Sequence, residues 1–94
     1  MKFGWALEMM KEGHRVHREG WNGKGMFVYY VGPNAYPVQT PAAVEYFGEG
    51  AMVPYNPYFA IKGVDGTVSV WVPSTGDVLA EDWDLNASTK EPVA

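Results

Sequence analysis

Residues 20–26 read GWNGKGM, and this stretch fixes where the chain turns between two apolar segments. Three glycines within six positions indicate a backbone that turns sharply or that lets another group approach its N–H groups. Trp21 adds a flat apolar face, Asn22 two donors and an acceptor, and Lys24 a mobile positive charge. Two interpretations are open: a clamp for a ring joined to phosphate, or a hairpin turn with Asn22-Gly23 as a type I′ pair and Trp21 in the core.

The composition predicts one small globular domain. The chain has 94 residues, of which 47% are hydrophobic and 15% aromatic, and a domain of this size benefits from association. It has no cysteine, which excludes disulfides and thiolate chemistry and favours a reducing cytosol. No apolar run reaches the roughly 20 residues of a membrane span, and the N-terminus lacks the pattern of a signal peptide. We therefore expect no membrane partner.

The charge is unevenly distributed along the chain. The net charge is −4, which argues against a nucleic-acid polymer as partner. Residues 1–24 contain five basic and three acidic side chains, so they carry +2 and the remainder carries −6. A small anion is therefore favoured near the N-terminal third, while long polyanions are repelled.

A short amphipathic helix is predicted over residues 3–12, ended by Gly13. Its expected core stripe consists of Phe3, Ala6, Leu7 and Met10. Trp5 and Met9 form a second apolar ridge, for which a subunit contact and a wider core face are both open.

Strands are predicted at residues 14–18, 26–31, 57–62, 68–72 and 82–85. The near-continuous apolarity of residues 26–31 predicts burial on both faces, and Trp83 and Leu85 are expected to point inward. In residues 68–72 the valines alternate with Ser69 and Trp71, so Trp71 is left for either a core or a pocket.

The proline-rich insertion at residues 32–57 contains a helix signature. Thr40 is placed as N-cap, Pro41 as the first helical residue and Gly48 as the stop. A further helical turn is expected near residues 78–81, capped by Ser74 or Thr75. Together these elements predict an α+β fold: a single domain over residues 1–85, with the N-terminal helix packed on a small antiparallel sheet, and a flexible tail at residues 86–94.

These motifs resemble, in order and spacing, a family of small phage proteins that counter the bacterial Thoeris defence, the second anti-Thoeris type. The positions that carry the resemblance are Phe3-Gly4, Ala6-Leu7-Glu8, Gly13, Arg18, residues 20–26, Asp65-Gly66, Trp71, Ser74, Asp77 and residues 79–83. It covers most of residues 3–85, whereas residues 32–57 and the tail look individual. One departure is Ser74-Thr75-Gly76-Asp77, where the family commonly reads Ser-Gln-Thr-Asp.

The resemblance implies a sponge and no catalysis. Family members form homotetramers and bind, without cleaving, the glycocyclic ADP-ribose signal that a defence TIR enzyme makes, so the effector stays inactive. Some relatives also hold cyclic dinucleotides in separate pockets. The expected location is the cytoplasm of the infected bacterial host, with no cofactor.

The residue chemistry is compatible with that role. A base can stack on Trp21, Trp71 or Phe27, and a pyrophosphate can take the backbone N–H groups of residues 23–25. Charge comes from Lys24 or Arg18, and polar side chains at residues 22, 74, 75 and 77 suit ribose hydroxyls. The predicted ligand-binding residues are Arg18, Trp21, Asn22, Gly23, Lys24, Met26, Phe27, Trp71, Ser74, Thr75 and Asp77.

Alternative functions remain open at this stage. Glu81 and Asp82 are adjacent carboxylates, and His14 and His17 can move protons, but the sequence assembles no nucleophile with an adjacent base. The two histidines lack partners for a metal ligand set, so no metal is expected. The alternatives are a sponge for cyclic dinucleotides, an enzyme that degrades the signal, and a structural phage module.

Overall fold

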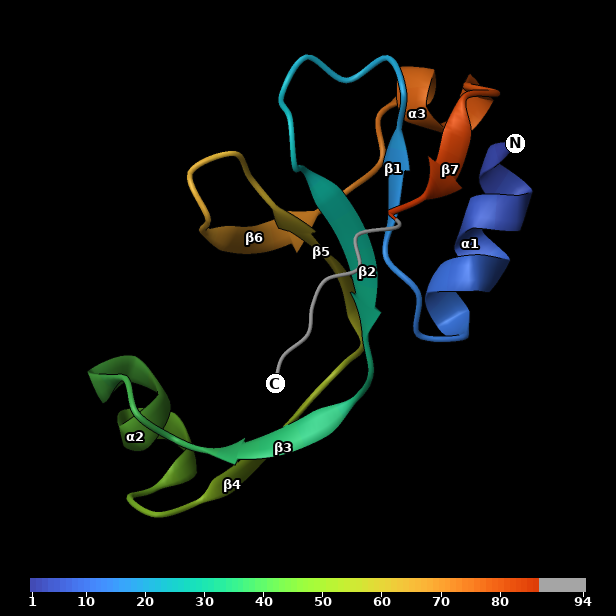
Figure 1. The fold of residues 1–94 in the computed structure, drawn as a ribbon. Coiled ribbons are helices and arrows are strands. Elements are labelled where there is room, and N and C mark those ends of the chain that lie inside the picture. The colour runs from blue at the N-terminus through green and yellow to red at the C-terminus, as the bar shows by residue number, and fades with distance from the viewer. Residues whose placement is uncertain (87–94) are drawn as a thin grey trace, which may run out of the picture.

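The fold has two parts, a sheet that carries helices on one face and a long arm that projects from it (Figure 1). The structure is a computed structural model and describes residues 1–86. Its elements are α1 (Phe3–Lys11), β1 (Val16–Arg18), β2 (Phe27–Val31), β3 (Asn34–Pro37), α2 (Pro41–Phe47), β4 (Met52–Tyr55), β5 (Tyr58–Lys62), β6 (Val68–Trp71), α3 (Thr75–Leu79) and β7 (Trp83–Leu85). The predicted α+β fold is confirmed. The predicted tail lies outside the described residues from residue 87 onward.

The main sheet is antiparallel and has the order β6-β5-β2-β1-β7. The short β1 lies between β2 and β7, with Val16 opposite Val28 and Arg18 opposite Trp83. The N–H of Trp83 also donates to the carbonyl of Met1 at 3.0 Å. The two ends of the described chain therefore meet beside the same strand.

The core lies between α1 and the sheet. Ala6 and Met10 of α1 are fully buried, together with Val16, Val28 and Trp83 of the sheet. The predicted helix is confirmed, and Gly13 has the positive φ of 99° expected of a residue that ends it.

The second ridge of α1 belongs to a wider core face within the single chain. Trp5 and Met9 pack against the core cluster and are partly exposed. Their predicted contact with another subunit stays a prediction.

The sheet face away from α1 overturns two expectations about burial. In β2 only Val28 is fully buried, while Phe27 and Tyr29 on the opposite face are half-exposed. The prediction that β2 is buried on both faces was therefore wrong. Its hydrophobic residues reflect strand propensity as well as burial, because no second layer covers this face in the described chain.

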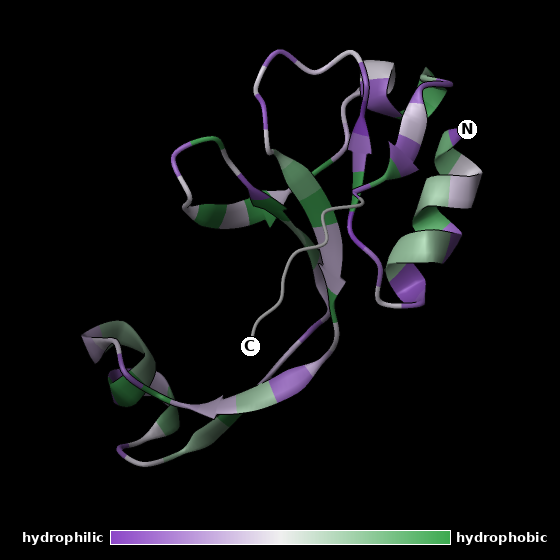
Figure 2. Ribbon diagram, in the orientation of Figure 1, coloured by the Kyte–Doolittle hydropathy of each residue, from purple (hydrophilic) through white to green (hydrophobic). Residues whose placement is uncertain are grey.

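The edge strand β6 shows the same effect. Val68 and Val70 are 54% and 67% exposed, whereas Trp71 points toward α1 and lies 6.5 Å from the ring of Phe3. Figure 2 shows the hydrophobic residues that this strand and β2 carry. Leu85 is also 38% exposed, so its predicted inward position was only partly right.

The arm continues the β2–β5 pair as one bent hairpin. Val31 is paired with Tyr58 in the sheet and Asn34 with Tyr55 in the arm, which is the same register on both sides of the break. Pro33 and Pro57 lie at the break and have no N–H to donate to a ladder. The prolines thus separate the hairpin into two sheets without shifting its register.

The helix α2 closes the tip of the arm as the sequence predicts. The Oγ1 of Thr40 accepts from the N–H of Ala43 at 3.2 Å, Pro41 is the first residue and Gly48 ends the helix with φ 99°. The strands β3 and β4 were not predicted. The arm gives the molecule a length of 45 Å and a radius of gyration of 16.0 Å, against about 12 Å for a compact domain of this size.

Candidate ligand-binding site

The connection between β1 and β2 is a wide loop of residues 19–26. Among residues 1–86 only glycines have positive φ, and Asn22 and Gly23 do not, so the type I′ pair of the turn interpretation was wrong. Gly25 does have a positive φ, of 78°. The connection is therefore an extended loop and not a two-residue hairpin turn.

Gly23 is the position where the loop approaches the rest of the molecule. A Cβ at this residue would overlap the Sδ of Met26 and the Cγ1 of Val64 in the β5–β6 turn. In addition, the Nζ of Lys62 donates to the carbonyl of Gly25 at 3.0 Å. The far side of the loop thus rests on the β5–β6 hairpin.

Arg18 and Asp82 hold the base of the same loop. The Nε of Arg18 donates to Oδ1 of Asp82 at 2.9 Å, and the N–H of Gly20 donates to Oδ2 of the same carboxylate at 2.8 Å. The Arg18 hydrogen bond is the largest effect that lowers the pKa of Asp82. The bonds to Asp82 and then to Asp77 raise the pKa of Arg18. All three groups therefore stay charged at neutral pH.

Asp77 connects this anchor to the short helix α3. Its N–H donates to Oγ of Ser74 at 3.1 Å, and its Oδ2 accepts from the N–H of Ser74 at 3.0 Å, which is a capping box. Oδ1 accepts from Arg18 at 2.9 Å and from the Nε1 of Trp21 at 3.4 Å. Burial alone would raise the pKa of Asp77, but these hydrogen bonds from Ser74, Arg18 and Trp21 together lower it.

The loop encloses a hollow of about 350 Å³ on its inner side. Six of the predicted ligand-binding residues line it: Arg18, Trp21, Asn22, Gly23, Lys24 and Met26. The remaining wall comes from His17, Glu19, Gly25 and Asn86. Asn22 and Lys24 are exposed there, whereas Trp21 is half-buried because its ring lies edge-on to Trp83 at 5.5 Å.

The other five predicted residues lie elsewhere. Ser74, Thr75 and Asp77 form the start of α3, and Ser74 and Asp77 use their side chains to cap it. The ring of Trp71 packs 6.1 Å from that of Phe59 and 6.1 Å from that of Trp83. Of the two positions left open for Trp71, the structure therefore shows the one in the core. Phe27 lies on the uncovered face of the sheet.

His17 lines the loop hollow and also has a buried polar atom without a hydrogen-bond partner in the described chain. This atom is its Nδ1, while its Nε2 lies 3.7 Å from Glu19. The sequence singled out His17 as a residue that can move protons in the enzyme alternative and as an incomplete metal ligand. Within residues 1–86, no group of three or more histidines, aspartates or glutamates is placed to hold a metal ion.

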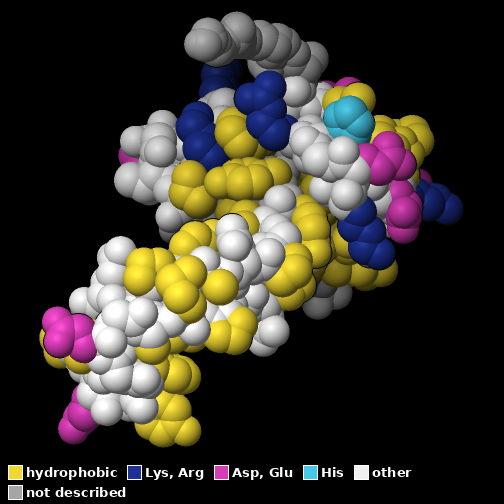
Figure 3. All heavy atoms as spheres, turned by 90° about the horizontal axis from the view of Figure 1, so that it is seen from below, with side chains coloured by type: hydrophobic (Ala, Val, Ile, Leu, Met, Phe, Trp, Pro, Cys, Tyr) yellow, Lys and Arg dark blue, Asp and Glu magenta, His cyan; other side chains and the backbone are white. Residues whose placement is uncertain are grey.

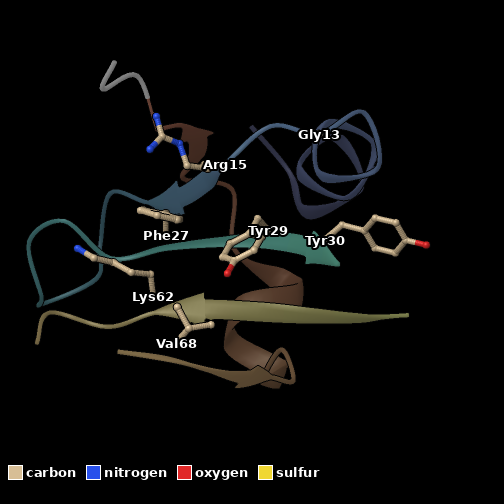
Figure 4. A pocket seen from close by; sticks show the side chains of 7 residues that line it. All are labelled: Gly13, Arg15, Phe27, Tyr29, Tyr30, Lys62 and Val68. Carbon is tan, nitrogen blue, oxygen red and sulfur yellow. The ribbon is translucent and has the colours of Figure 1, made fainter. Parts of the chain in front are cut away.

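A second hollow, of about 270 Å³, lies on the uncovered face of the sheet (Figure 4). Arg15, Phe27, Tyr29 and Lys62 contribute to its wall. Apart from Phe27, these residues were missed by sequence reasoning. The available signal was the alternation in β2, which puts residues 27 and 29 on one face, but the cross-strand position of Lys62 opposite Phe27 comes from the strand pairing.

This α+β fold with its glycine-rich loop belongs to a known class. A family model described as Tad2-like, Thoeris anti-defense 2-like domain, matches residues 1–85, so the chain belongs to this family. A particular relative is the protein named Thoeris anti-defense 2 of Bacillus phage SP01. It is 44% identical over 89 residues, which cover 90% of this chain and 93% of that protein. No helix of the described part is long and apolar enough to cross a membrane.

Proposed function

We propose that this protein counters Thoeris defence in the cytoplasm of an infected bacterium by binding a cyclic ADP-ribose-type signal and holding it uncleaved. The ligand is glycocyclic ADP-ribose, which a TIR enzyme makes, and its removal keeps the downstream effector inactive. The anti-Thoeris role follows from membership of the Thoeris anti-defense 2-like family. The sequestration mechanism and the ligand are our proposal.

The loop hollow is the observation that carries the proposal. Its volume of about 350 Å³ falls within the range of roughly 300–1,000 Å³ that is usual for small-molecule sites. Lys24 supplies a positive charge, Asn22 supplies hydrogen-bonding groups, and the half-buried Trp21 supplies an aromatic surface. The loop is anchored at both ends, so little conformational entropy is lost when a ligand binds.

The protonation states of the nearby carboxylates support binding without catalysis. A general acid at neutral pH needs a raised pKa, whereas the pKa values of Asp77 and Asp82 are both lowered. Both carboxylates are also occupied by hydrogen bonds from Arg18. They therefore serve to hold the loop, and the enzyme alternative has no acid in these two residues.

A sponge must compete with the effector for the signal, which requires nanomolar affinity, about −12 kcal/mol. We propose that a homo-oligomer, a tetramer, provides the additional contacts. The support is the apolar surface of the arm, where Tyr46 is 83%, Met52 61% and Tyr55 51% exposed in the single chain. Figure 3 shows hydrophobic side chains along this arm and acidic ones at its far end.

Light scattering tests the assembly. Replacing residues 33–56 by a short glycine-containing turn should leave β2 paired with β5 and convert the oligomer to a smaller species. An unchanged mass, in units of the shortened chain, would contradict a role of the arm in assembly.

The central experiment separates a sponge from an enzyme. The protein is incubated with glycocyclic ADP-ribose, separated from free ligand and then heat-denatured, and the released molecule is analysed by mass spectrometry. We expect intact signal in stoichiometric amounts. A hydrolysed product would identify an enzyme, and no retained ligand would refute both functions.

Calorimetry with loop variants tests the site itself. Asn22→Ala and Lys24→Gln change exposed side chains, so they should each weaken binding about tenfold or more without altering stability. Trp21→Ala would change stability as well as binding, because Trp21 also packs on Trp83. The matched control is Lys2→Gln, which removes the same charge from an exposed residue before α1. Equal affinity of both loop variants and the control would place the ligand elsewhere.

The same titration with a cyclic dinucleotide tests the alternative ligand. Binding of the cyclic dinucleotide at nanomolar affinity, with none of glycocyclic ADP-ribose, would replace the proposed signal by this second class.

A further inference from the structure

The side chain of Asp77 accepts hydrogen bonds from three donors of the protein. Its Oδ2 accepts from the N–H of Ser74 at 3.0 Å, and its Oδ1 accepts from Arg18 at 2.9 Å and from the Nε1 of Trp21 at 3.4 Å. The residue is only 9% exposed, so water has little access to these bonds. Among the described residues, Trp21 lines the loop hollow and Asp77 does not. Asp77 therefore contacts Trp21 from behind the candidate site.

An ionised carboxylate is the group that satisfies this arrangement. It accepts on both oxygens, whereas the amide of an asparagine has one accepting oxygen and one donating NH₂ group. In either orientation that NH₂ group would face a donor, which is the N–H of Ser74 on one side and the groups of Arg18 and Trp21 on the other. Burial acts to raise the pKa of Asp77, but the hydrogen bonds lower it overall, so the carboxylate stays ionised at neutral pH.

The backbone of Asp77 holds the neighbouring indole. Its carbonyl oxygen accepts from the Nε1 of Trp83 at 2.9 Å, and Trp83 is fully buried in the core. The rings of Trp21 and Trp83 are nearly perpendicular, at 80°, with their centres 5.5 Å apart. Trp83 is fixed by the core around it, whereas Trp21 is half-buried and packs against the edge of that core. One residue of α3 thus bonds the N–H groups of both indoles.

We propose that Asp77 is a positioning residue, which fixes the orientation of the Trp21 ring for ligand binding. An indole can be turned over about its bond to Cβ, and its N–H then points to the opposite side. The bond from Nε1 to Asp77 selects one of these orientations, so the surface that Trp21 turns to the hollow is set before a ligand binds. The inference rests on the proposed function for the identity of the ligand. It gives Asp77 an indirect role in place of a bond to a ribose hydroxyl.

NMR measurement of hydrogen exchange tests the position of the ring without a ligand. Asp77→Asn should accelerate exchange of the Trp21 Nε1–H about tenfold or more, while the N–H of Gly20 keeps its rate. Asp82→Asn is the matched control, because it changes the other carboxylate that Arg18 bonds. It should accelerate exchange at Gly20 and leave the Trp21 Nε1–H unchanged. Unchanged exchange at Trp21 in Asp77→Asn, or equal acceleration in both variants, would overturn the inference.

Calorimetry with glycocyclic ADP-ribose tests the consequence for binding. Asp77→Asn and Trp21→Phe should each weaken binding about tenfold, since the first disturbs the acceptor and the second removes the donor of the same bond. The double variant should bind no more weakly than Trp21→Phe alone. These losses are measurable if the unmodified protein binds at nanomolar affinity.

Two binding results would contradict the positioning role. Losses that multiply to about a hundredfold in the double variant would mean that Asp77 acts on the ligand independently of Trp21. Undiminished affinity of Trp21→Phe would mean that the bond has no role in binding. The second result does not depend on the folding of Asp77→Asn, because Trp21→Phe leaves the bonds of Asp77 to Ser74 and Arg18 in place.

The two measurements separate this inference from the proposed function. If the unmodified protein retains no glycocyclic ADP-ribose, the proposed function fails, and the exchange rates still decide whether Asp77 holds Trp21. If the unmodified protein binds the signal, and Asp77→Asn accelerates the indole exchange without changing the affinity, the function stands and the positioning role is overturned.

Discussion

The sheet body and the arm are held together by different means. The body, residues 1–31 and 58–86, places five hydrophobic side chains in a common buried cluster between α1 and the sheet. The arm, residues 32–57, contains no fully buried residue within the described structure. Its shape is held by the pairing of β3 with β4 and by the capped helix α2.

The body and the arm therefore differ in what stabilises them. Burial of apolar surface is the main stabilising contribution in a small domain, and the body has it. The arm has ordered backbone and an exposed apolar surface, so a partner is needed for comparable stabilisation. The candidate loop site belongs to the body, where its anchor is tied to α3 and β7.

The largest expected effect comes from the core of the body. Trp83→Ala removes the largest fully buried side chain, and with it the bond from its Nε1 to the carbonyl of Asp77 at 2.9 Å. Urea denaturation should show a loss of about 3–5 kcal/mol in the free energy of unfolding. Tyr46→Ala in the arm is the matched aromatic control and should cost less than about 0.5 kcal/mol in dilute monomer. A similar loss from both variants in the monomer would contradict the comparison, because it would mean that the exposed Tyr46 contributes as much as the buried Trp83.

The next effect comes from the anchor of the loop. Arg18→Met keeps a long side chain but leaves Asp77 buried without its cation, so the free energy of unfolding should fall by about 3 kcal/mol. Hydrogen exchange at the N–H groups of residues 20–25 should accelerate more than exchange in α2. If the loop exchanges no faster than in the unmodified protein, Arg18 does not position it.

The pH dependence of stability tests the same anchor without mutation. The pKa values of Asp77 and Asp82 are lowered from 3.8 in the folded state, so their stabilisation is fully present above about pH 4. It is lost as the pH falls through the lowered values, below 3.8. Thermal unfolding should therefore show a steep loss in this acidic range, and Arg18→Met should make the loss shallower. Equal slopes for both proteins would count against the ion pairs.

The smallest expected effect lies in the arm. Thr40→Ala removes the N-cap of α2 and should destabilise that helix locally by about 1 kcal/mol. Hydrogen exchange in α2 should rise, while the urea midpoint of the body stays unchanged. Thr40→Ser, which keeps the hydroxyl, is the control. A shifted midpoint with Thr40→Ala would show that arm and body unfold together.

Much of the secondary structure could be predicted because its signals are local. Thr40, Pro41 and Gly48 specify α2, and Ser74 with Asp77 specifies the start of α3, through hydrogen bonds within a few residues. The strands β3 and β4 escaped prediction because Pro37 and Pro54 lie within them, and prolines argue against strands. Their pairing is fixed by the continued register of β2 and β5.

The candidate site was predictable only in its contiguous part. Residues 20–26 came from one stretch of sequence, and the structure places five of the predicted residues there in one hollow with Arg18. The roles of Arg18 and Asp77 in the anchor were not evident, because Arg18 meets Asp82 and Asp77 across 64 and 59 positions of the chain. Arg15 and Lys62 likewise meet at Phe27 only through strand pairing.

The sequence by itself determined the helices, most strands, the glycine-rich loop and the family, since each depends on residues that are near in the chain or on their order. Only the tertiary structure decided which face of a strand is buried. The valines of β6 and the Phe27 face of β2 stay open because α1 covers the opposite side, where Trp71 and Trp83 pack. Hydrophobicity marks a residue as suitable for burial, but one helix can cover only one face of a sheet, and the chain's path selects that face.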